Sequence, residues 1–194
     1  LPLENVYLGF KNNLSIEKNC IKIAKDDGLR IIKYDEKIVS KYLFKNYIIS
    51  TCYGRAEFGA RSLGNRSILA NPSEYANIQK IKEKIKNRDF WMPFAPVILN
   101  EHSNTLIKNS KNIFSPYMTI AFNSKKVGFQ KLIAASHPAD KTIRPQMLNK
   151  ETNLKYYNII NEFYKLSGIP SLLNTSFNLH GYPIVNTSLD AYDV

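Results

Sequence analysis

The chain of 194 residues carries 27 Lys and Arg against 16 Asp and Glu, a formal net charge of +11 at pH 7, and 44% of its residues are hydrophobic. A chain of this length and composition can bury a hydrophobic core without disulfide bonds or structural metal ions, which excludes intrinsic disorder as its main state. No apolar run is long enough for a membrane helix, so no membrane partner is expected. Cys20 and Cys52 lie far apart and outside any Cys/His cluster, which predicts a cytoplasmic location and no metal site.

The hydrophobic pattern of the amino-terminal half predicts helices that alternate with short strands. The predicted elements are a helix over 16–25, a strand over 30–34, a helix over 36–44, a buried strand over 47–52 and a helix from Ser73 to about Lys86. In the last helix Ile78, Ile81 and Ile85 recur on one face, which is typical of a helix packed on a core. The Ser73 side chain is its expected cap, because a serine hydroxyl can accept from a first-turn N–H group.

The alternation continues in the carboxy-terminal half. The predicted elements are strands over 94–99 and 117–122, a helix that begins near Leu154 and packs heavily, and a short buried strand over 171–173. Gly168 closes the helix and Pro170 prevents its continuation. With no internal repeat or flexible linker, this order favours a single domain of the α/β (α+β) class, in which helices flank one twisted, mixed, open sheet.

A loop rich in glycine and arginine, residues 54–67, follows the predicted strand over 47–52. Glycine lets the backbone approach an anion closely, and guanidinium groups can grip it through paired N–H donors. The segment is therefore a candidate anion-binding loop. The alternative is a structural turn in which Arg55 pairs with Glu57 or Glu74.

Further cations lie near predicted element ends. Lys86 and Arg88 stand at the end of a helix, on the border of its buried face, where they can reach a cleft or simply complement the helix dipole. His137 and Asp140 could orient a general base or bind a metal, but without a third ligand a surface histidine is favoured. Arg144, in a segment that the following proline forces to be extended, is the better candidate for an anion contact.

Neutral polar side chains follow the last predicted strand. Asn174 and Ser176 lie on one face if the backbone is extended, because side chains alternate along a strand. A carboxamide and a hydroxyl in this arrangement suit phosphate oxygens or a small carbonyl or amide group, although a self-satisfied turn explains them equally well. Taken together, cations and polar groups collect at the ends of several strands, where α/β sheets bind ligands.

The net charge predicts attraction to polyanions of some kind, meaning nucleic acid, anionic lipid or phosphorylated small molecules. It does not choose among these classes. A solvated, lysine-rich surface without a binding role is the alternative explanation.

Four blocks of the sequence resemble the carboxy-terminal domain of the O-carbamoyltransferases associated with nodulation factors and antibiotics. The blocks are GRAEFGARSLGNRSILANP at 54–72, IKNRDFWMPFAPVIL at 85–99, HPADKTIRPQ at 137–146 and GIPSLLNTSFNLHGYPIV at 168–185. They occur in the family's order and span most of the chain, so the match is far more specific than a single short motif.

The resemblance implies that residues 1–194 form a single YrdC-like domain. This domain would be a fragment of a longer chain, and the fragment would lack the amino-terminal transferase domain. It implies binding of ATP with Mg²⁺ and of carbamoyl phosphate, and formation of carbamoyl adenylate. The amino-terminal domain, which carries the family's iron site, would then transfer the carbamoyl group to an acceptor hydroxyl.

Carried over by position, the resemblance also assigns residues. The expected ligand contacts are Arg61, Lys86, Arg88, Arg144, Asn174 and Ser176. Of these, Lys86, Arg144 and Ser176 are the expected catalytic residues. Met92 stands where the family usually has a ligand-binding arginine, and Lys141 is a hypothetical replacement for that charge. A homodimer is left open and a nucleic-acid partner is not expected, but the alternative function is a non-catalytic RNA-binding or docking module of the same fold.

Overall fold

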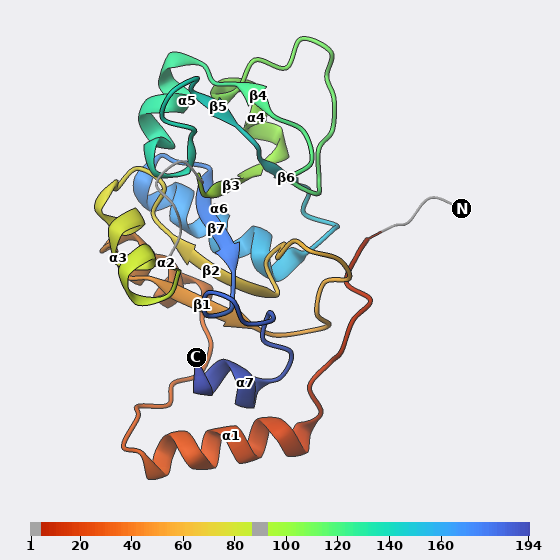
Figure 1. Cartoon of the computed structure of the whole chain (residues 1–194), viewed down its shortest axis with the longest axis vertical. Helices are drawn as coiled ribbons and strands as arrows, with labels where there is room; N and C mark the ends of the chain where they lie inside the picture. The colour runs from red at the N-terminus through yellow and green to blue at the C-terminus, as the bar shows by residue number, and fades with distance from the viewer. Residues whose placement is uncertain (1–4, 87–92) are drawn as a thin grey trace.

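A five-stranded mixed sheet organises the protein, whose computed structural model describes residues 5–86 and 93–194 (Figure 1). In spatial order the strands are β1 (Ile49–Cys52), β2 (Arg66–Ala70), β7 (Ser171–Ser176), β3 (Ala95–Leu99) and β6 (Gln146–Leu148). Neighbouring strands are antiparallel except β3 and β6, which are parallel. Asn174 of β7 lies opposite Leu69 on one side and Ala95 on the other, which places it in the middle of the sheet.

Helices cover both faces of this sheet. The helices α2 (Glu36–Phe44) and α6 (Leu154–Ser167) pack on one face, and α3 (Ala76–Lys84) packs on the other. Alternation along β2 produces the two cores, because Leu69 joins the cluster with α2 and α6 while Ile68 joins the cluster with α3. The expected mixed open sheet flanked by helices is therefore confirmed.

Local signals explain where α2 begins and where α6 ends. The Asp35 carboxylate accepts from the backbone N–H groups of Lys37 and Ile38, which caps the start of α2. Gly168 ends α6 in the left-handed conformation, with φ 68°, as the sequence predicts.

Smaller elements lie at the two ends of the sheet (Figure 1). The strand pair β4 (Phe122–Asn123) and β5 (Thr142–Ile143) lies beyond the β3 and β6 side with α4 (Ser103–Leu106) and α5 (Lys126–Lys131). The short helix η1 (Asn100–His102) adjoins α4, whereas η2 (Ile133–Ala135) contacts α3 and β7. At the opposite end, α1 (Leu14–Asp26) packs against α7 (Ser188–Asp193). None of the helices in the described ranges has the length and apolar character that a membrane crossing requires.

Several predicted elements are confirmed, with shifted ends. The helices over 16–25 and 36–44 correspond to α1 and α2, and the strands over 47–52 and 94–99 correspond to β1 and β3. The predicted strand over 171–173 continues to Ser176. β1 is an edge strand rather than a buried one, since only Thr51 among its residues is buried.

Other predictions are wrong. Residues 30–34 form no strand, because within the described ranges no neighbouring strand pairs with them, and Ile31, Ile32 and Tyr34 are each somewhat less than half exposed. Of residues 117–122, only Phe122 is in a strand, and the segment begins as a turn. Ser73 does not cap α3, because its own N–H donates to the Asn71 side chain and the helix begins later, at Ala76.

Candidate functional site

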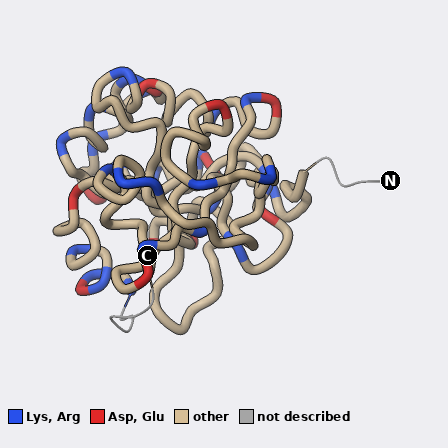
Figure 2. Tube along the Cα trace, turned by 90° about the horizontal axis from the view of Figure 1, so that it is seen from above, with Lys and Arg blue, Asp and Glu red and all other residues tan. Residues whose placement is uncertain are grey.

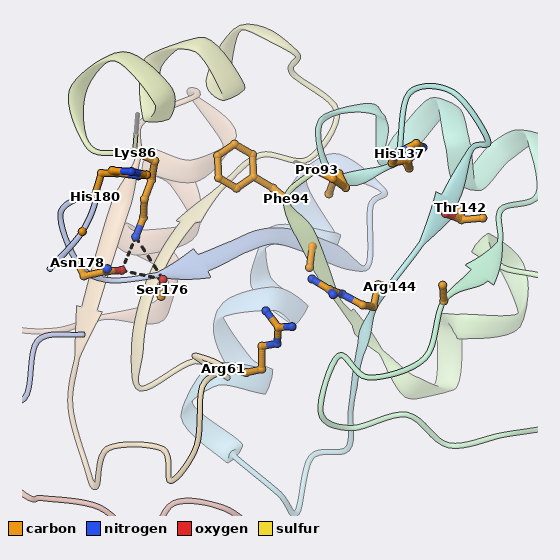
Figure 3. A pocket seen from close by; sticks show the side chains of 14 residues that line it. Arg61, Lys86, Pro93, Phe94, His137, Thr142, Arg144, Ser176, Asn178 and His180 are labelled. Atoms are coloured by element: carbon orange, nitrogen blue, oxygen red, sulfur yellow. Dashed lines mark hydrogen bonds between the residues drawn. The ribbon is translucent and has the colours of Figure 1, made fainter. Parts of the chain in front are cut away.

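A cavity of about 560 Å³ opens where several strands of the sheet end (Figure 3). Ser176 is the last residue of β7, Arg61 precedes β2, and Arg144 lies between β5 and β6. Lys86 follows α3, and Phe94 immediately precedes β3. The antiparallel pairing of β2 and β3 with β7 brings these distant segments to one edge of the sheet.

A hydrogen-bonded group of three side chains forms one wall of the cavity. The Lys86 ammonium donates to Ser176 Oγ at 3.2 Å and to Asn178 Oδ1, while Ser176 Oγ donates to Asn178 Oδ1 at 2.7 Å. The Asn178 amide nitrogen donates to the carbonyls of Leu179 and Tyr182, which fixes its oxygen toward the lysine. Lys86 is only 2% exposed, so its charge is held in place at the cavity wall.

Two arginines form the opposite wall. The guanidinium groups of Arg61 and Arg144 turn toward one another in Figure 3. Burial, and then the like charge of Arg61, lower the pKa of the Arg144 guanidinium. The described lining residues include no Asp or Glu, so an anion is the group that would relieve this repulsion.

A smaller hollow of about 90 Å³ adjoins the cavity, with Arg61, Arg144 and Ser176 lining both. It adds Ser62 and Asn174, whose amide nitrogen donates to the Ser62 carbonyl at 2.9 Å. Asn174 Oδ1 and Ser62 Oγ are buried and have no hydrogen-bond partner within the described structure. Such groups can bind a ligand that supplies the missing partner.

The loop that carries Arg61 is shaped by a carboxylate. Glu57 Oε1 accepts from the backbone N–H groups of Leu63 at 2.6 Å and Asn65 at 2.8 Å. Arg55 does not pair with Glu57 or Glu74, because its guanidinium donates to the Leu8 carbonyl at 2.7 Å. The expected alternative of an Arg55 ion pair is therefore wrong.

His137 lies at the cavity rather than on a remote surface, with 32% of its side chain exposed. Its Nδ1 is 3.1 Å from Asp140 Oδ1. Hydrogen bonds from the Thr142 backbone and hydroxyl, followed by the nearby His137, lower the pKa of Asp140. No cluster of three or more metal-binding side chains occurs in the described ranges, so the pair by itself makes no metal centre.

The structure brings most of the predicted site residues together. Arg61, Lys86, Arg144 and Ser176 line the cavity, and Asn174 lines the adjoining hollow. Their assignment to ligand contact or catalysis stays a prediction. Arg88 and Met92 lie outside the described residues.

Lys141 is not brought to the cavity. Its ammonium lies over the Phe129 ring, 5.3 Å from the centroid, and it is not among the lining residues. Sequence reasoning missed Asn178 and His180, both of which line the cavity. Asn178 was detectable, because it follows Ser176 at the spacing of two that relates Ser176 to Asn174.

Fold and cavity together define a mixed α/β domain with a cavity lined by basic and neutral polar side chains. Residues 40–194 match the family model described as Carbamoyltransferase C-terminus. The chain belongs to this family of carbamoyltransferase carboxy-terminal domains, as its four sequence blocks predict.

Known proteins extend the comparison. The uncharacterized protein MJ1051 of Methanocaldococcus jannaschii is 41% identical over 197 residues, covering 98% of this chain and 37% of that protein. Nodulation protein NolNO of Sinorhizobium fredii is 38% identical over 154 residues, covering 78% of this chain and 22% of that protein. Nodulation protein NolO of Bradyrhizobium diazoefficiens is 38% identical over 145 residues, covering 74% and 26%. The chain thus spans well under half the length of these relatives.

The fold also resembles that of a solved structure, full-length HypF in its phosphate- and nucleotide-bound form. The TM-score is 0.56 at 14% sequence identity, covering 84% of this chain and 20% of HypF. At this identity the likeness concerns the fold, and it agrees with the expected YrdC-like architecture.

Proposed function

We propose that this domain binds ATP with Mg²⁺ and carbamoyl phosphate in the cavity and forms carbamoyl adenylate. The observation that carries the proposal is the convergence of Lys86, Arg61 and Arg144 on one cavity whose described lining has no carboxylate. Its volume of about 560 Å³ lies within the usual range for small-molecule sites. The name of the HypF structure, phosphate- and nucleotide-bound, supports the ligand class.

The side chains that line the cavity are suited to binding phosphate groups rather than to coordinating a metal ion directly. Mg²⁺ in such sites is usually held by one or two carboxylates together with substrate phosphates. The described lining offers no carboxylate, and Asn178 Oδ1 already accepts from Lys86 and Ser176. In the proposal the cavity residues would therefore hold Mg²⁺ only through the phosphates of the bound nucleotide, where the ion would supply further charge neutralisation.

The side chains act by binding and charge neutralisation. In the proposal, carbamoyl phosphate is cleaved by water to carbamate and phosphate, and a carbamate oxygen attacks the α-phosphorus of ATP as pyrophosphate leaves. Arg61 and Arg144 hold the crowded phosphates, and the Lys86 ammonium is already oriented by Ser176 and Asn178. Groups fixed before the reaction stabilise developing charge without reorganising, so no covalent nucleophile is needed.

Transfer to an acceptor hydroxyl is assigned, in the proposal, to an amino-terminal domain of the same polypeptide, where the iron would also reside. Residues 1–194 would then be the adenylate-forming part of a longer chain. A cytoplasmic location stays a prediction.

The testing experiment measures pyrophosphate release from ATP by this chain, with and without carbamoyl phosphate. The proposal expects release only when both substrates and Mg²⁺ are present. Calorimetry on the same sample measures ATP affinity. Absence of ATP binding, or release that does not depend on carbamoyl phosphate, would overturn the proposal.

A second candidate, an RNA-binding module, is motivated by the net charge of +11. Figure 2 shows Lys and Arg spread around the trace, with fewer Asp and Glu among them. This alternative expects strong, salt-sensitive RNA binding and indifference to ATP. The converging cavity residues favour the nucleotide site, because general RNA affinity would not require them to meet at one point.

A further inference from the structure

A second concave surface, which shares no lining residue with the candidate site, runs from α2 across the edge strand β1 to α3. It consists of two hollows of about 550 and 220 Å³ that share Lys45. We call this surface the β1 groove. Figure 1 shows β1 at the outer edge of the sheet, with α3 beside it.

The charge in the β1 groove has one sign. Lys41 and Lys45 come from α2 and its cap, and Lys80 and Lys84 come from α3. All four are exposed, none takes part in an ion pair within the described part of the chain, and the groove lining has no Asp or Glu. An occupant of this groove should therefore be acidic.

The groove also has an apolar component. Tyr47 is 57% exposed and stacks edge-on against Tyr42, with ring centroids 5.3 Å apart. Ile38 lies beside Tyr42, while Ile48 and Ile85 line the larger hollow. Exposed apolar side chains with a charged border are typical of protein interaction surfaces.

The backbone of β1 supplies the third feature. β1 stands first in the order of the sheet and, among the residues that the structure describes, it pairs with β2 alone. Its outer edge therefore presents N–H and C=O groups of the kind that an extended peptide can pair with. Ser50 of β1 and the preceding Ile48 line the larger hollow together with Lys80 and Lys84 of α3, so the lysines adjoin this edge strand.

We propose that the β1 groove docks an acidic, extended segment of a partner protein, which adds to the sheet as a strand beside β1. Side chains alternate along a strand, so every second residue of the added segment would face Lys45, Lys80 and Lys84. Asp or Glu side chains at those positions would contact the lysines. The apolar side chains between them would point to the other face of the sheet.

A second copy of this chain and an RNA strand fit less well. Two β1 edges brought together would place like-charged lysines opposite one another, which is unfavourable. The Tyr42 and Tyr47 rings are already packed edge-on against each other, which limits flat stacking on bases. The free backbone edge, in contrast, matches a peptide.

The test uses fluorescence anisotropy with a labelled ten-residue peptide that alternates Glu and Val. Its matched control has the same sequence with alternate backbone amides methylated, which keeps the charge and removes strand pairing. We expect the unmodified peptide to bind at least tenfold more tightly than the methylated one. Equal binding of the two peptides would overturn strand addition, and absence of binding by either would overturn the site.

Variants locate the site. Lys80→Ala with Lys84→Ala should weaken peptide binding at least tenfold, whereas the charge-matched pair Lys18→Ala with Lys22→Ala on α1 should not change it. Equal weakening of peptide binding by both pairs of substitutions would overturn the proposal. It would also be overturned if single-stranded oligouridylate bound more tightly than the peptide and its binding depended on the α3 lysines. ATP affinity is measured on the same variants and should stay unchanged. If the unmodified chain binds the peptide but not ATP, the result would contradict the proposed nucleotide site and leave the peptide site supported.

Discussion

The Lys86 ammonium donates to Ser176 Oγ at 3.2 Å, although the two residues are 90 positions apart in the chain. The contact exists because α3 delivers Lys86 to one face of the sheet and β7 ends there with Ser176. Asn178 Oδ1 accepts from both, so the three side chains form one unit. The lysine is therefore oriented before any ligand arrives.

Removing one cation from the cavity should weaken nucleotide binding. We expect Lys86→Ala or Arg144→Ala to reduce ATP affinity by about 1–3 kcal/mol, the scale of a charge-assisted hydrogen bond. Calorimetry measures the change, and Lys22→Ala, an exposed lysine of α1, serves as the control. Unchanged ATP affinity in both cavity variants would count against the assigned site.

Glu57 should matter for the loop that carries Arg61, although it does not line the cavity. Its Oε1 accepts from the backbone N–H groups of Leu63 and Asn65, so Glu57→Ala leaves these donors without a partner. We expect a loss of about 1–3 kcal/mol in unfolding free energy, measured in urea, and weaker phosphate binding. Full stability with normal phosphate affinity would show that the loop does not depend on this carboxylate.

Gly64 combines a positive φ with the close approach of a buried aromatic ring. A Cβ atom there would lie 2.3 Å from the Tyr156 ring, and the backbone φ is +119°. Gly64→Ala should therefore add a steric cost of about 1–3 kcal/mol to the strain of a positive φ. Gly28→Ala is the control, because its φ is +75° and no heavy atom lies within 4 Å of the added Cβ. Equal losses in thermal unfolding would contradict the steric account.

The elements that sequence reasoning predicted well are those whose signals are local. The cap at Asp35 and the left-handed Gly168 define their helices without long-range information. The predicted loop over 54–67 includes Arg66 and Ser67, but these two residues begin β2 and are fully buried. The Arg66 guanidinium is satisfied by the distant carbonyls of Tyr53 and Asn186, which no local pattern reveals.

The opposite error occurred at residues 30–34. Their β-branched and aromatic side chains favour a strand, but a strand needs a neighbour, and none of the described segments pairs with these residues. In the candidate site, too, local sequence signals and long-range strand pairing contribute different information. Residue type indicated the chemistry of Arg61 and Lys86, whereas the pairing of β2 and β3 with β7 decided that they meet.

The last prediction concerns alkaline pH. Burial is the main cause that raises the pKa of Tyr7 to about 12, and its hydroxyl donates to the Leu63 carbonyl at 2.8 Å. Because the unfolded phenol titrates near pH 10, the protonated Tyr7 contributes stability that is complete below about pH 10 and is lost as the pH rises toward about 12. Tyr7→Phe should lower stability at pH 7 by about 1 kcal/mol through loss of the hydrogen bond, yet reduce the further loss above pH 10.

Urea unfolding between pH 7 and 11.5 measures this dependence. Burial also raises the pKa of Tyr53 and Tyr156, so the substitution should flatten the alkaline decline in part rather than abolish it. Tyr75→Phe is the control, since this side chain is 54% exposed and removing its hydroxyl should leave the decline as it is. The Tyr7→Phe variant has no phenol at this position, so deprotonation there can no longer lower its stability. An alkaline decline that is equally steep in this variant and in the unmodified chain would therefore contradict the assignment to Tyr7.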